Sequence, residues 1–435
     1  MSAVDTQPDT GSVRLPAPSR EAKGRGTRDP RPVRSTRLAP WARVFGAVFA
    51  ISWGGNQFSP LLLMYENRDH YSSVLVNGFL GIYVLGLAPA LLIAGSLSDR
   101  HGRKPMTLIG LLLAVMGSGI LALGPLGPEF LLVGRLFSGL AVGVAMAVGT
   151  SWIKELSQAP HDPKADVSSG ARRGSLAFTL GSGLGALVAG LIAQWGPIPE
   201  VLPFAIHIVV AIVFALIVWR APESHTSGGV TGPWYRQLSV PSFRHRRFIR
   251  VVMISCPWIF AGAAIAYGYL PTQLRGATGS WGLVFATAAT VIALGVSSAI
   301  APLSRRVHSS SSARGLAAMV LLTAIGLVLV IVAIRQQSVV LGLGANVVIG
   351  FGMGFGLFSG LQEVQTIAGK RDLAGLTGIF YAFAYLGFLA PVVIAALTVL
   401  ASVSVILTVF VGLAVVSFVL VLVSFRKHLP EALEV

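Results

Sequence analysis

The sequence has few charged residues. Only 11% of its 435 residues are Asp, Glu, Lys or Arg, whereas 54% are hydrophobic and the mean hydropathy is +0.75. A helix that crosses a membrane needs roughly 20 apolar residues, so twelve of them would use about 240 residues. That is nearly the whole hydrophobic content of the chain. The composition therefore excludes a large soluble domain and predicts a protein that lies almost entirely within a membrane.

Reactive side chains are scarce as well. Cys256 is the one cysteine, and it cannot form an internal disulfide. The sequence shows no grouping of His, Cys and Asp near one interface, which an enzyme would need for its nucleophile, base or metal ligands. It therefore predicts no enzymatic activity, no metal and no cofactor. A membrane-embedded sensor is disfavoured too, because the polar segments leave no room for an output domain.

The net charge of +16 does not indicate a nucleic-acid partner, because the positive residues are spread between apolar runs. Residues 1–38 are rich in Pro, Arg, Ser and Gly and lack the apolar core of a secretory signal. Such a segment cannot bury enough surface to offset its chain entropy. We expect a disordered, basic cytoplasmic tail, and a tail that binds the lipid surface is the alternative.

Twelve apolar stretches follow the tail, each long enough to cross a hydrocarbon core of about 30 Å as a helix. Backbone groups in lipid must satisfy their own hydrogen bonds, and a helix does so within one segment. Alternating segments of strand length are absent, which argues against a β-barrel. The predicted spans are 41–65, 73–96, 106–125, 129–153, 172–195, 200–220, 249–273, 281–303, 314–335, 338–362, 373–399 and 402–425.

The distribution of Lys and Arg predicts the orientation. With the N-terminus inside, 29 of the 33 Lys and Arg fall in inner segments. The outer segments hold Arg68, Arg275 and Arg335, and Arg135 lies within a span. An excess of this size follows the positive-inside rule, so we expect both termini to be cytoplasmic and the protein to lie in the cell (inner) membrane.

The longest inner connection divides six spans from six, as in a transporter built from two halves. The predicted domains are a bundle at 39–220, a cytoplasmic linker at 221–248, a second bundle at 249–426 and a short tail at 427–435. Spans 4 and 10 both end with an acid, Glu155 and Glu363. The loop GSLSDRHGRK after span 2 aligns with APLSRRVHSS after span 8, where Arg305 replaces Asp99. The sequence therefore predicts that the two halves are duplicates and that the second copy of this loop has diverged from the first.

The loop at residues 95–104 carries a family resemblance. It resembles the motif G-x-L-x-D-R-x-G-R-K of the major facilitator superfamily at all seven fixed positions, between spans 2 and 3. The resemblance implies an all-α membrane protein of twelve transmembrane helices in two six-helix bundles. It also implies a transporter that works by alternating access, has a small-molecule substrate and the lipid bilayer as partners, and acts as a monomer.

The same loop predicts a conformational latch at the inner face. Asp99 lies among basic side chains and is favoured as a carboxylate that holds the halves together, while two glycines permit a tight turn. Charge pairs at this edge can break and reform as the halves rock. The alternative for the loop is an ordinary turn rich in basic residues, and the alternative for Glu155 is a surface charge in contact with water. The predicted latch residues are Gly95, Asp99, Arg100, Gly102, Arg103, Lys104, Glu155 and Arg173.

Two residues within spans are candidates for coupling. Arg135 and Gly139 match the R-x-x-x-G pattern of the fourth helix in the superfamily, and a charge within a span needs a partner. Arg135 is predicted to be a fixed positive charge near the cavity, with snorkelling to the outer interface as the alternative. His207 could titrate near neutral pH, although a hydrogen-bonded core histidine is the favoured interpretation.

Span 5 bears on the direction of transport. Proton-driven exporters of the superfamily carry G-x-x-x-G-P-x-x-G-G here, and Gly181, Gly185 and Gly190 fit it. Ala186 replaces the proline and Ala189 replaces a glycine, which weakens the assignment to exporters. Small residues still permit close helix contact.

Polar and aromatic residues near the bilayer midplane predict the substrate cavity. An apolar, aromatic cavity with few amides suits a hydrophobic or amphiphilic solute better than a sugar. Placement in the interfacial belt is the alternative for each Tyr and Trp. The candidates are Trp53, Asn56, Gln57, Tyr267, Tyr269, Gln273, Asn346, Tyr381 and Tyr385.

The resulting prediction is a secondary transporter that exports drugs or hydrophobic metabolites by proton antiport. An uptake symporter or facilitator for a small metabolite is the alternative. None of the 17 acids lies at the centre of a predicted span. A proton gradient as the driving force is therefore implied by the resemblance alone.

Overall fold

The computed structural model describes residues 38–166, 168–224, 240–309, 311–369, 372–427 and 429. The predicted N-terminal tail up to residue 37 lies outside the described residues. So do linker residues 225–239 and the tail residues 428 and 430–435. Nothing in the structure therefore bears on the predicted disorder of the tail.

Among the described residues, the first half of the chain forms eight α-helices and a single-turn 3-10 segment, η1 (Gly124–Leu126). A π-helical segment, η2 (Ala145–Gly149), makes α5 continuous with α6. The helices are α1 (Pro40–Asn56), α2 (Leu61–Arg68), α3 (Ser73–His101), α4 (Arg103–Leu121), α5 (Pro128–Val144), α6 (Thr150–Leu156), α7 (Ser169–Trp195) and α8 (Leu202–Val218).

The second half is also helical, and many of its elements are short pieces that follow one another along the chain. The pieces are η4 (Pro241–Arg244), η5 (Phe248–Val252), α9 (Met253–Ser255), α10 (Trp258–Ala263), η6 (Ala264–Tyr269), α11 (Leu270–Gln273), α12 (Arg275–Thr278) and η7 (Gly279–Trp281), then α17 (Leu373–Tyr385), η8 (Leu386–Leu389) and α18 (Ala390–Leu397). The remaining helices are α13 (Gly282–Ala299), α14 (Ala301–Val307), α15 (Arg314–Gln336), α16 (Val339–Ile367) and α19 (Val403–Val423).

Ten helical stretches among the described residues are long and apolar enough to cross a membrane. Two of the twelve predicted spans are shorter. One is α8, with 17 residues. The other was predicted as one helix over 41–65 and is instead broken between α1 and α2. Proline has no N–H, so Pro60 removes one donor of the helical ladder. The Ser59 N–H donates to the carbonyl of Asn56 at 3.1 Å, which closes a tighter turn.

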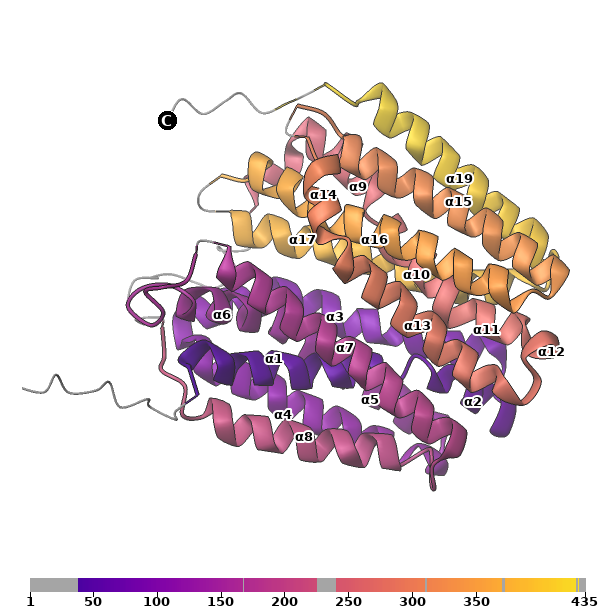
Figure 1. The fold of residues 1–435 in the computed structure, drawn as a ribbon, viewed down its shortest axis with the longest axis horizontal. Helices are drawn as coiled ribbons and strands as arrows, with labels where there is room; N and C mark the ends of the chain where they lie inside the picture. The colour runs from indigo at the N-terminus through magenta and orange to yellow at the C-terminus, as the bar shows by residue number, and fades with distance from the viewer. Residues whose placement is uncertain are drawn as a thin grey trace, which may run out of the picture. The chain divides into compact units, whose positions relative to one another are not determined.

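Helices pack first against neighbours of their own half, such as α3 on α5 and α15 on α16. The two halves meet where α7 packs against α13, where α3 packs against α17 and α18, and where α2 packs against α13. In Figure 1, α1, α4, α5, α7 and α8 run alongside one another in indigo to magenta, and α15, α16 and α19 group in orange to yellow.

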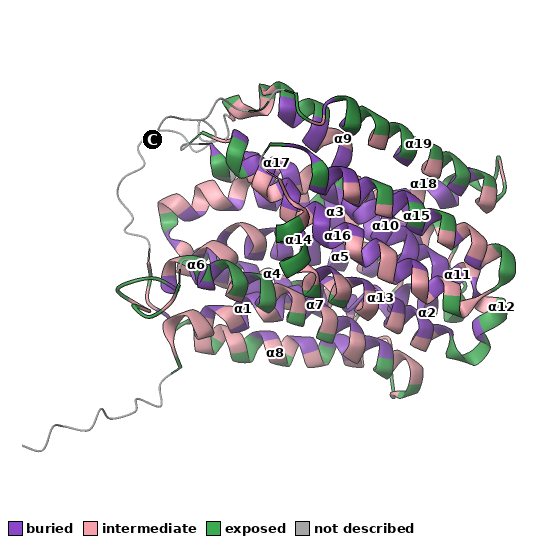
Figure 2. Ribbon diagram, turned by 45° about the horizontal axis from the view of Figure 1, so that its top comes forward, coloured by how far each residue is buried: buried purple, intermediate pink, exposed green. Residues whose placement is uncertain are grey.

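Burial follows the same division. Figure 2 shows buried residues concentrated on α3, α5, α10 and α16, whereas α19 is largely exposed. The exposed positions of α19 are apolar, for example Val409, Leu413 and Val416. Apolar side chains on an outer surface suit lipid rather than water. The prediction of an all-α membrane protein is confirmed.

Candidate functional site

The predicted site residues lie at three levels of the helix bundle. We name the end that holds Arg103, Glu155 and Arg247 the Arg103 end. We name the end that holds Glu66, Glu200 and Arg275 the Glu66 end. The aromatic residues and Arg135 lie between the two ends.

Arg103 is the centre of the charge cluster at the Arg103 end. Its Nη1 lies 2.8 Å from Oδ1 of Asp99, four residues earlier in the chain, and its Nη2 lies 3.0 Å from Glu155 Oε1. Nη1 also donates to Ser98 Oγ at 2.9 Å. One guanidinium therefore holds the end of α3, the start of α4 and the end of α6 together. Its planar fork allows it to bind two carboxylates at once.

Gly102 and Glu223 complete this cluster. Gly102 links α3 to α4 with φ of 98° and ψ of 162°, a conformation that side-chain-bearing residues rarely adopt. Glu223 accepts from the backbone N–H groups of Arg103 at 3.0 Å and Lys104 at 2.8 Å. A carboxylate at a helix N-terminus satisfies donors that the helix cannot and is favoured by the helix dipole. The segment Ala221-Pro222-Glu223-Ser224 resembles a common ending of the first half in the superfamily, but the sequence alone did not place Glu223 in the cluster.

Two of the predicted latch residues lie apart from Arg103. Arg173 pairs with Asp162 at 2.7 Å, and its guanidinium lies 3.9 Å from the centre of the Trp41 ring. Gly95 lies inside α3, where an added Cβ would meet no atom within 4 Å. The close approach expected at both glycines thus occurs at Gly102 and not at Gly95.

The second half has its own charge pair at the same end. Arg247 is fully buried, and its Nε and Nη2 donate to the two carboxylate oxygens of Glu363, both at 2.6 Å. Arg314, at the start of α15, donates to the carbonyls of Arg306 and Val307 at the end of α14. The second half has Arg305 where the first half has Asp99, and in this loop Arg314 caps a helix. The sequence flagged Glu363 but not Arg247.

Arg135 lies between the two ends and is only 2% exposed. Its guanidinium carbon lies 4.2 Å from the centre of the Tyr83 ring and 4.9 Å from that of Phe58. Its Nη1 donates to the carbonyl of Gly55 at 3.0 Å and its Nε to that of Phe79 at 3.2 Å. Aromatic faces and carbonyl dipoles stabilise a buried cation without a carboxylate. The alternative, snorkelling to the interface, does not fit this burial.

The break in the first span supplies one of these carbonyls. In an unbroken helix the Ser59 N–H would reach the carbonyl of Gly55. It donates instead to Asn56, which leaves the Gly55 carbonyl for Arg135. Gly139 also helps to form the surroundings of Arg135, because an added Cβ at this position would clash with the Tyr83 carbonyl oxygen. This glycine allows α3 to approach α5 closely and brings the Tyr83 ring over Arg135.

An aromatic cluster joins the two halves beside Arg135. Tyr385 is stacked on Phe260 with ring centres 4.2 Å apart and meets Tyr83 of the first half edge-on at 6.5 Å. Phe388 is stacked on Phe260 at 5.3 Å and also meets Tyr83 at 6.4 Å. The sequence predicted Tyr385 but missed Tyr83 and Phe260. The spacing of Phe79 and Tyr83, one helical turn apart, was the available signal for a shared aromatic face.

Several other predicted cavity residues form hydrogen bonds within one half. The amide of Gln57 donates to Ser118 Oγ at 3.1 Å, which lies 2.7 Å from His207 Nδ1. His207 Nε2 lies 2.9 Å from the carbonyl of Ala50. A carbonyl only accepts, so Nε2 carries a proton, and the ring links α1, α4 and α8 through hydrogen bonds. This geometry fits the core histidine that the sequence favoured.

Some of the remaining cavity candidates are buried within the bundle, and Gln273 lies at the Glu66 end. Asn56 donates to Ser182 at 2.9 Å, and the fully buried Asn346 donates to the carbonyl of Ala266 at 3.1 Å. Gln273 accepts from Gln337 through its backbone at the Glu66 end. Trp53, Tyr267 and Tyr269 are buried, and Tyr381 lies half-buried beside Phe380.

Every carboxylate among the described residues lies close to a helix end or in a connection. Those at the Glu66 end are Glu66, Asp69, Glu129 and Glu200, and those at the Arg103 end are Asp99, Glu155, Asp162, Asp166, Glu223, Glu363 and Asp372. Within the described ranges, no three His, Cys, Asp or Glu side chains are grouped to hold a metal ion. The centre is therefore aromatic and carries the positive charge of Arg135.

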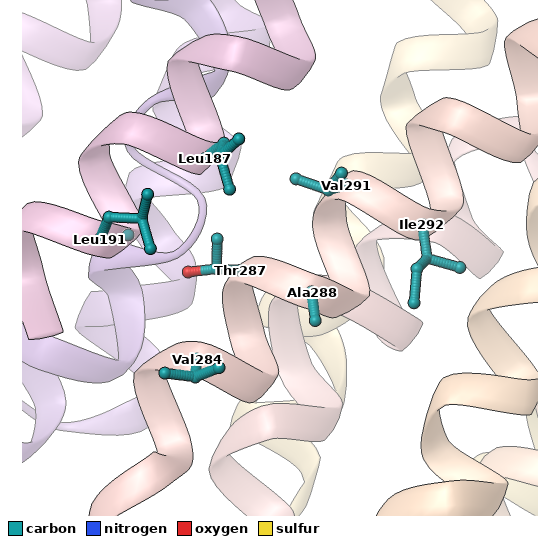
Figure 3. A pocket seen from close by; sticks show the side chains of 8 residues that line it. Leu187, Leu191, Val284, Thr287, Ala288, Val291 and Ile292 are labelled. Atoms are coloured by element: carbon teal, nitrogen blue, oxygen red, sulfur yellow. The ribbon is translucent and has the colours of Figure 1, made fainter.

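A separate apolar groove of 270 Å³ lies between α7 and α13 (Figure 3). The hydroxyl of Thr287, the one polar side chain of the lining, donates to the carbonyl of Leu283 at 2.7 Å. Leu191 is exposed at its edge. The groove suits hydrocarbon and offers no free group to orient a polar solute. Its lining is Leu187, Gly190, Leu191, Val284, Thr287, Ala288, Val291 and Ile292.

Comparison with known proteins places the chain in a family. Residues 44–388 match the model described as Major Facilitator Superfamily. The chain is 33% identical over 144 residues to the uncharacterized MFS-type transporter YfiU of Bacillus subtilis, which covers 33% of this chain and 27% of that protein. It is 30% identical over 164 residues to the chloramphenicol resistance protein CraA of Acinetobacter baumannii, covering 38% of this chain and 39% of that one. Both matches span well under two thirds of the relative's length.

Solved structures share the fold at low sequence identity. A POT family transporter in complex with 5-aminolevulinic acid superposes with a TM-score of 0.71 at 13% identity, over 90% of this chain and 96% of that one. The nucleoside transporter NupG superposes with a TM-score of 0.67 at 14% identity, over 88% and 99% of the two chains. The resemblance first inferred from residues 95–104 is confirmed. This chain belongs to the major facilitator superfamily of secondary transporters.

Proposed function

We propose that this transporter exports drugs or hydrophobic metabolites, with proton antiport as its driving force. The observation that carries the proposal is the centre of the bundle, where Tyr83, Phe260, Tyr385 and Phe388 form an aromatic cluster across the two halves. Such a surface binds flat or apolar solutes by contact area and offers few hydrogen bonds for a hydroxyl-rich sugar.

The charges around this cluster indicate which charge a transported solute carries. Arg135 is buried beside Tyr83, and the carboxylates of the described residues lie toward the two ends. A cationic solute would meet a like charge in a medium of low dielectric constant. The proposal therefore favours neutral or anionic aromatic compounds. In the transport cycle Arg135 acts as the fixed charge to which proton movement is coupled.

In this proposal the cluster around Arg103 is a conformational latch between α3, α4 and α6 within the first half, and not between the two halves. Asp99 and Glu155 share one guanidinium, so movement of α3 or α6 breaks one ion pair and leaves the other. Arg247 and Glu363 hold the second half in the same way. The Arg103 end lies on the cytoplasmic side of the cell membrane, as the excess of Lys and Arg predicts.

An uptake symporter or facilitator is the second candidate. Ala186, in place of the proline of the exporter motif, favours it. The relatives include, beside the chloramphenicol resistance protein, a probable inositol transporter 2 of Arabidopsis thaliana. It is 34% identical over 128 residues, which are 28% of this chain and 21% of that one.

Transport by proteoliposomes with an imposed pH gradient tests the proposal. We expect a panel of aromatic compounds to be moved against their gradient when protons run the other way, and an uncoupler to abolish this movement. The matched variants are Tyr385→Phe, which keeps the stack on Phe260, and Tyr385→Ala, which removes it. Tyr385→Ala should lose transport and Tyr385→Phe retain most of it. Accumulation in the same direction as protons would establish the symporter instead.

A further inference from the structure

An ion pair joins the two halves of the protein at the Glu66 end. Arg275 Nη2 of α12 lies 2.8 Å from Glu66 Oε2 of α2. The side chain of Glu66 is 11% exposed and that of Arg275 is 39% exposed, so solvent screens this pair only in part. Ser73 Oγ at the start of α3 donates to the other carboxylate oxygen and fixes its orientation. Glu66 belongs to the first half of the chain and Arg275 to the second.

Two further contacts connect the halves at the same end. The side-chain amide of Gln194, at the end of α7, donates to the carbonyl of Ser280 at 2.9 Å. The rings of Trp195 and Trp281 meet edge-on with their centres 6.1 Å apart. Both contacts join the end of α7 to η7, while α2 packs against α13 close by. An ion pair, a hydrogen bond and an aromatic contact therefore all join the two halves at the Glu66 end.

The charge pairs of Arg103 and Arg247 have a different arrangement. Arg103 pairs with Asp99 and Glu155 of its own half, and Arg247 pairs with Glu363 of its own half. Those pairs can stay intact while the two halves move as bodies. The pair between Glu66 and Arg275 cannot, because its partners move apart when the halves separate at this end.

We propose that Glu66 and Arg275 form the gate that closes the transport path at the Glu66 end, and that opening this end requires their ion pair to break. Separating the charges is unfavourable in a partly buried site, so the pair biases the protein toward the state closed at this end. This inference rests on alternating access between two halves and not on the identity or direction of the solute.

The structure supplies a matched control. Arg68 Nε lies 3.1 Å from Glu200 Oε1, at the same end and within the first half. Neutralising Arg68 removes a comparable ion pair without touching the contact between the halves. A variant at Arg68 therefore shows the effect of losing one surface ion pair while the contact between the halves is kept.

Distance measurement between spin labels tests the gate without any substrate. Labels replace Val74 at the start of α3 and Val340 at the start of α16, which are both exposed and belong to different halves. Cys256 is fully buried and is replaced by serine in the parent protein to exclude its labelling. Pulsed electron paramagnetic resonance then measures the distribution of distances in lipid nanodiscs.

We expect Glu66→Gln and Arg275→Gln each to raise the population at long distances about fivefold or more, the lower range of coupling between two states. The swapped pair, Glu66→Arg with Arg275→Glu, should return the distribution toward that of the parent. Arg68→Gln should leave it unchanged. The proposal is overturned if both neutral variants match Arg68→Gln, or if the swapped pair opens as far as the single variants. Because no solute or gradient is present, failure here differs from failure of the proposed drug export.

Discussion

Replacing Gly102 by alanine tests how the loop between α3 and α4 is held. Its φ of 98° and ψ of 162° lie in a region that is essentially restricted to glycine, and another residue there costs on the order of 1–3 kcal/mol. An added Cβ would also lie 2.6 Å from Glu223 Oε2. The carboxylate must then move from the N–H groups of Arg103 and Lys104, and loss of such a cap costs typically about 1 kcal/mol.

We expect Gly102→Ala to lower the stability of the protein by about 2–4 kcal/mol, the sum of these two effects. Thermal unfolding of the purified protein in detergent, followed by tryptophan fluorescence, measures the change. Gly95→Ala is the control, because the same methyl group there meets no atom within 4 Å and lies inside a helix. Equal melting temperatures for Gly102→Ala and Gly95→Ala would show that neither the backbone conformation of Gly102 nor the Glu223 cap stabilises this loop. Glu223→Gln, which keeps one acceptor oxygen, should lie between the two.

Three further outcomes are expected. Gly181→Ala places a Cβ 2.2 Å from the Phe49 carbonyl oxygen and should cost roughly 1–3 kcal/mol of stability in thermal unfolding, whereas Gly183→Ala, with open space around it, should not. Burial, and next the charge of Glu200, raise the pKa of Asp69 above its value in the unfolded chain. The protonated carboxyl of Asp69 therefore stabilises the folded protein fully below about pH 4, and this stabilisation is lost as the pH rises and the group ionises. Asp69→Asn should therefore melt higher than the parent at pH 7, with the difference closing toward pH 4. Arg135→Lys keeps the charge but not the planar fork that reaches two carbonyls, and should lower the transport rate in proteoliposomes at least about tenfold, or 1.4 kcal/mol; an unchanged rate would contradict a role for the guanidinium.

Much of the helical architecture followed from the sequence, because lipid leaves the backbone few alternatives. Runs of apolar residues located the spans, and the motif at residues 95–104 predicted the family. Two of the predicted latch residues, Glu155 and Arg103, form an ion pair in the structure. The boundaries of the two bundles and the roles of the latch residues stay predictions.

Other features depend on contacts between distant segments and were missed for that reason. Glu223 caps α4 from 119 and 120 residues away, which no local pattern reveals. Arg247 was one basic residue among several in a polar stretch, and only the fold brings it to Glu363. The break in the first span had a local signal in Pro60, but apolarity outweighed it because proline is tolerated within membrane helices.

That break affects how the first span follows the movement of the two halves. The segment beyond Pro60 is a separate helix of 8 residues, about 12 Å long at 1.5 Å per residue. Its first five residues, Leu61–Tyr65, are buried, so it is anchored in the bundle while its far end carries Glu66. A short turn between two helices can absorb a change of angle, as hinges do. The part of the span at the Glu66 end can therefore tilt as the halves separate while the hydrogen bonds of α1 stay intact.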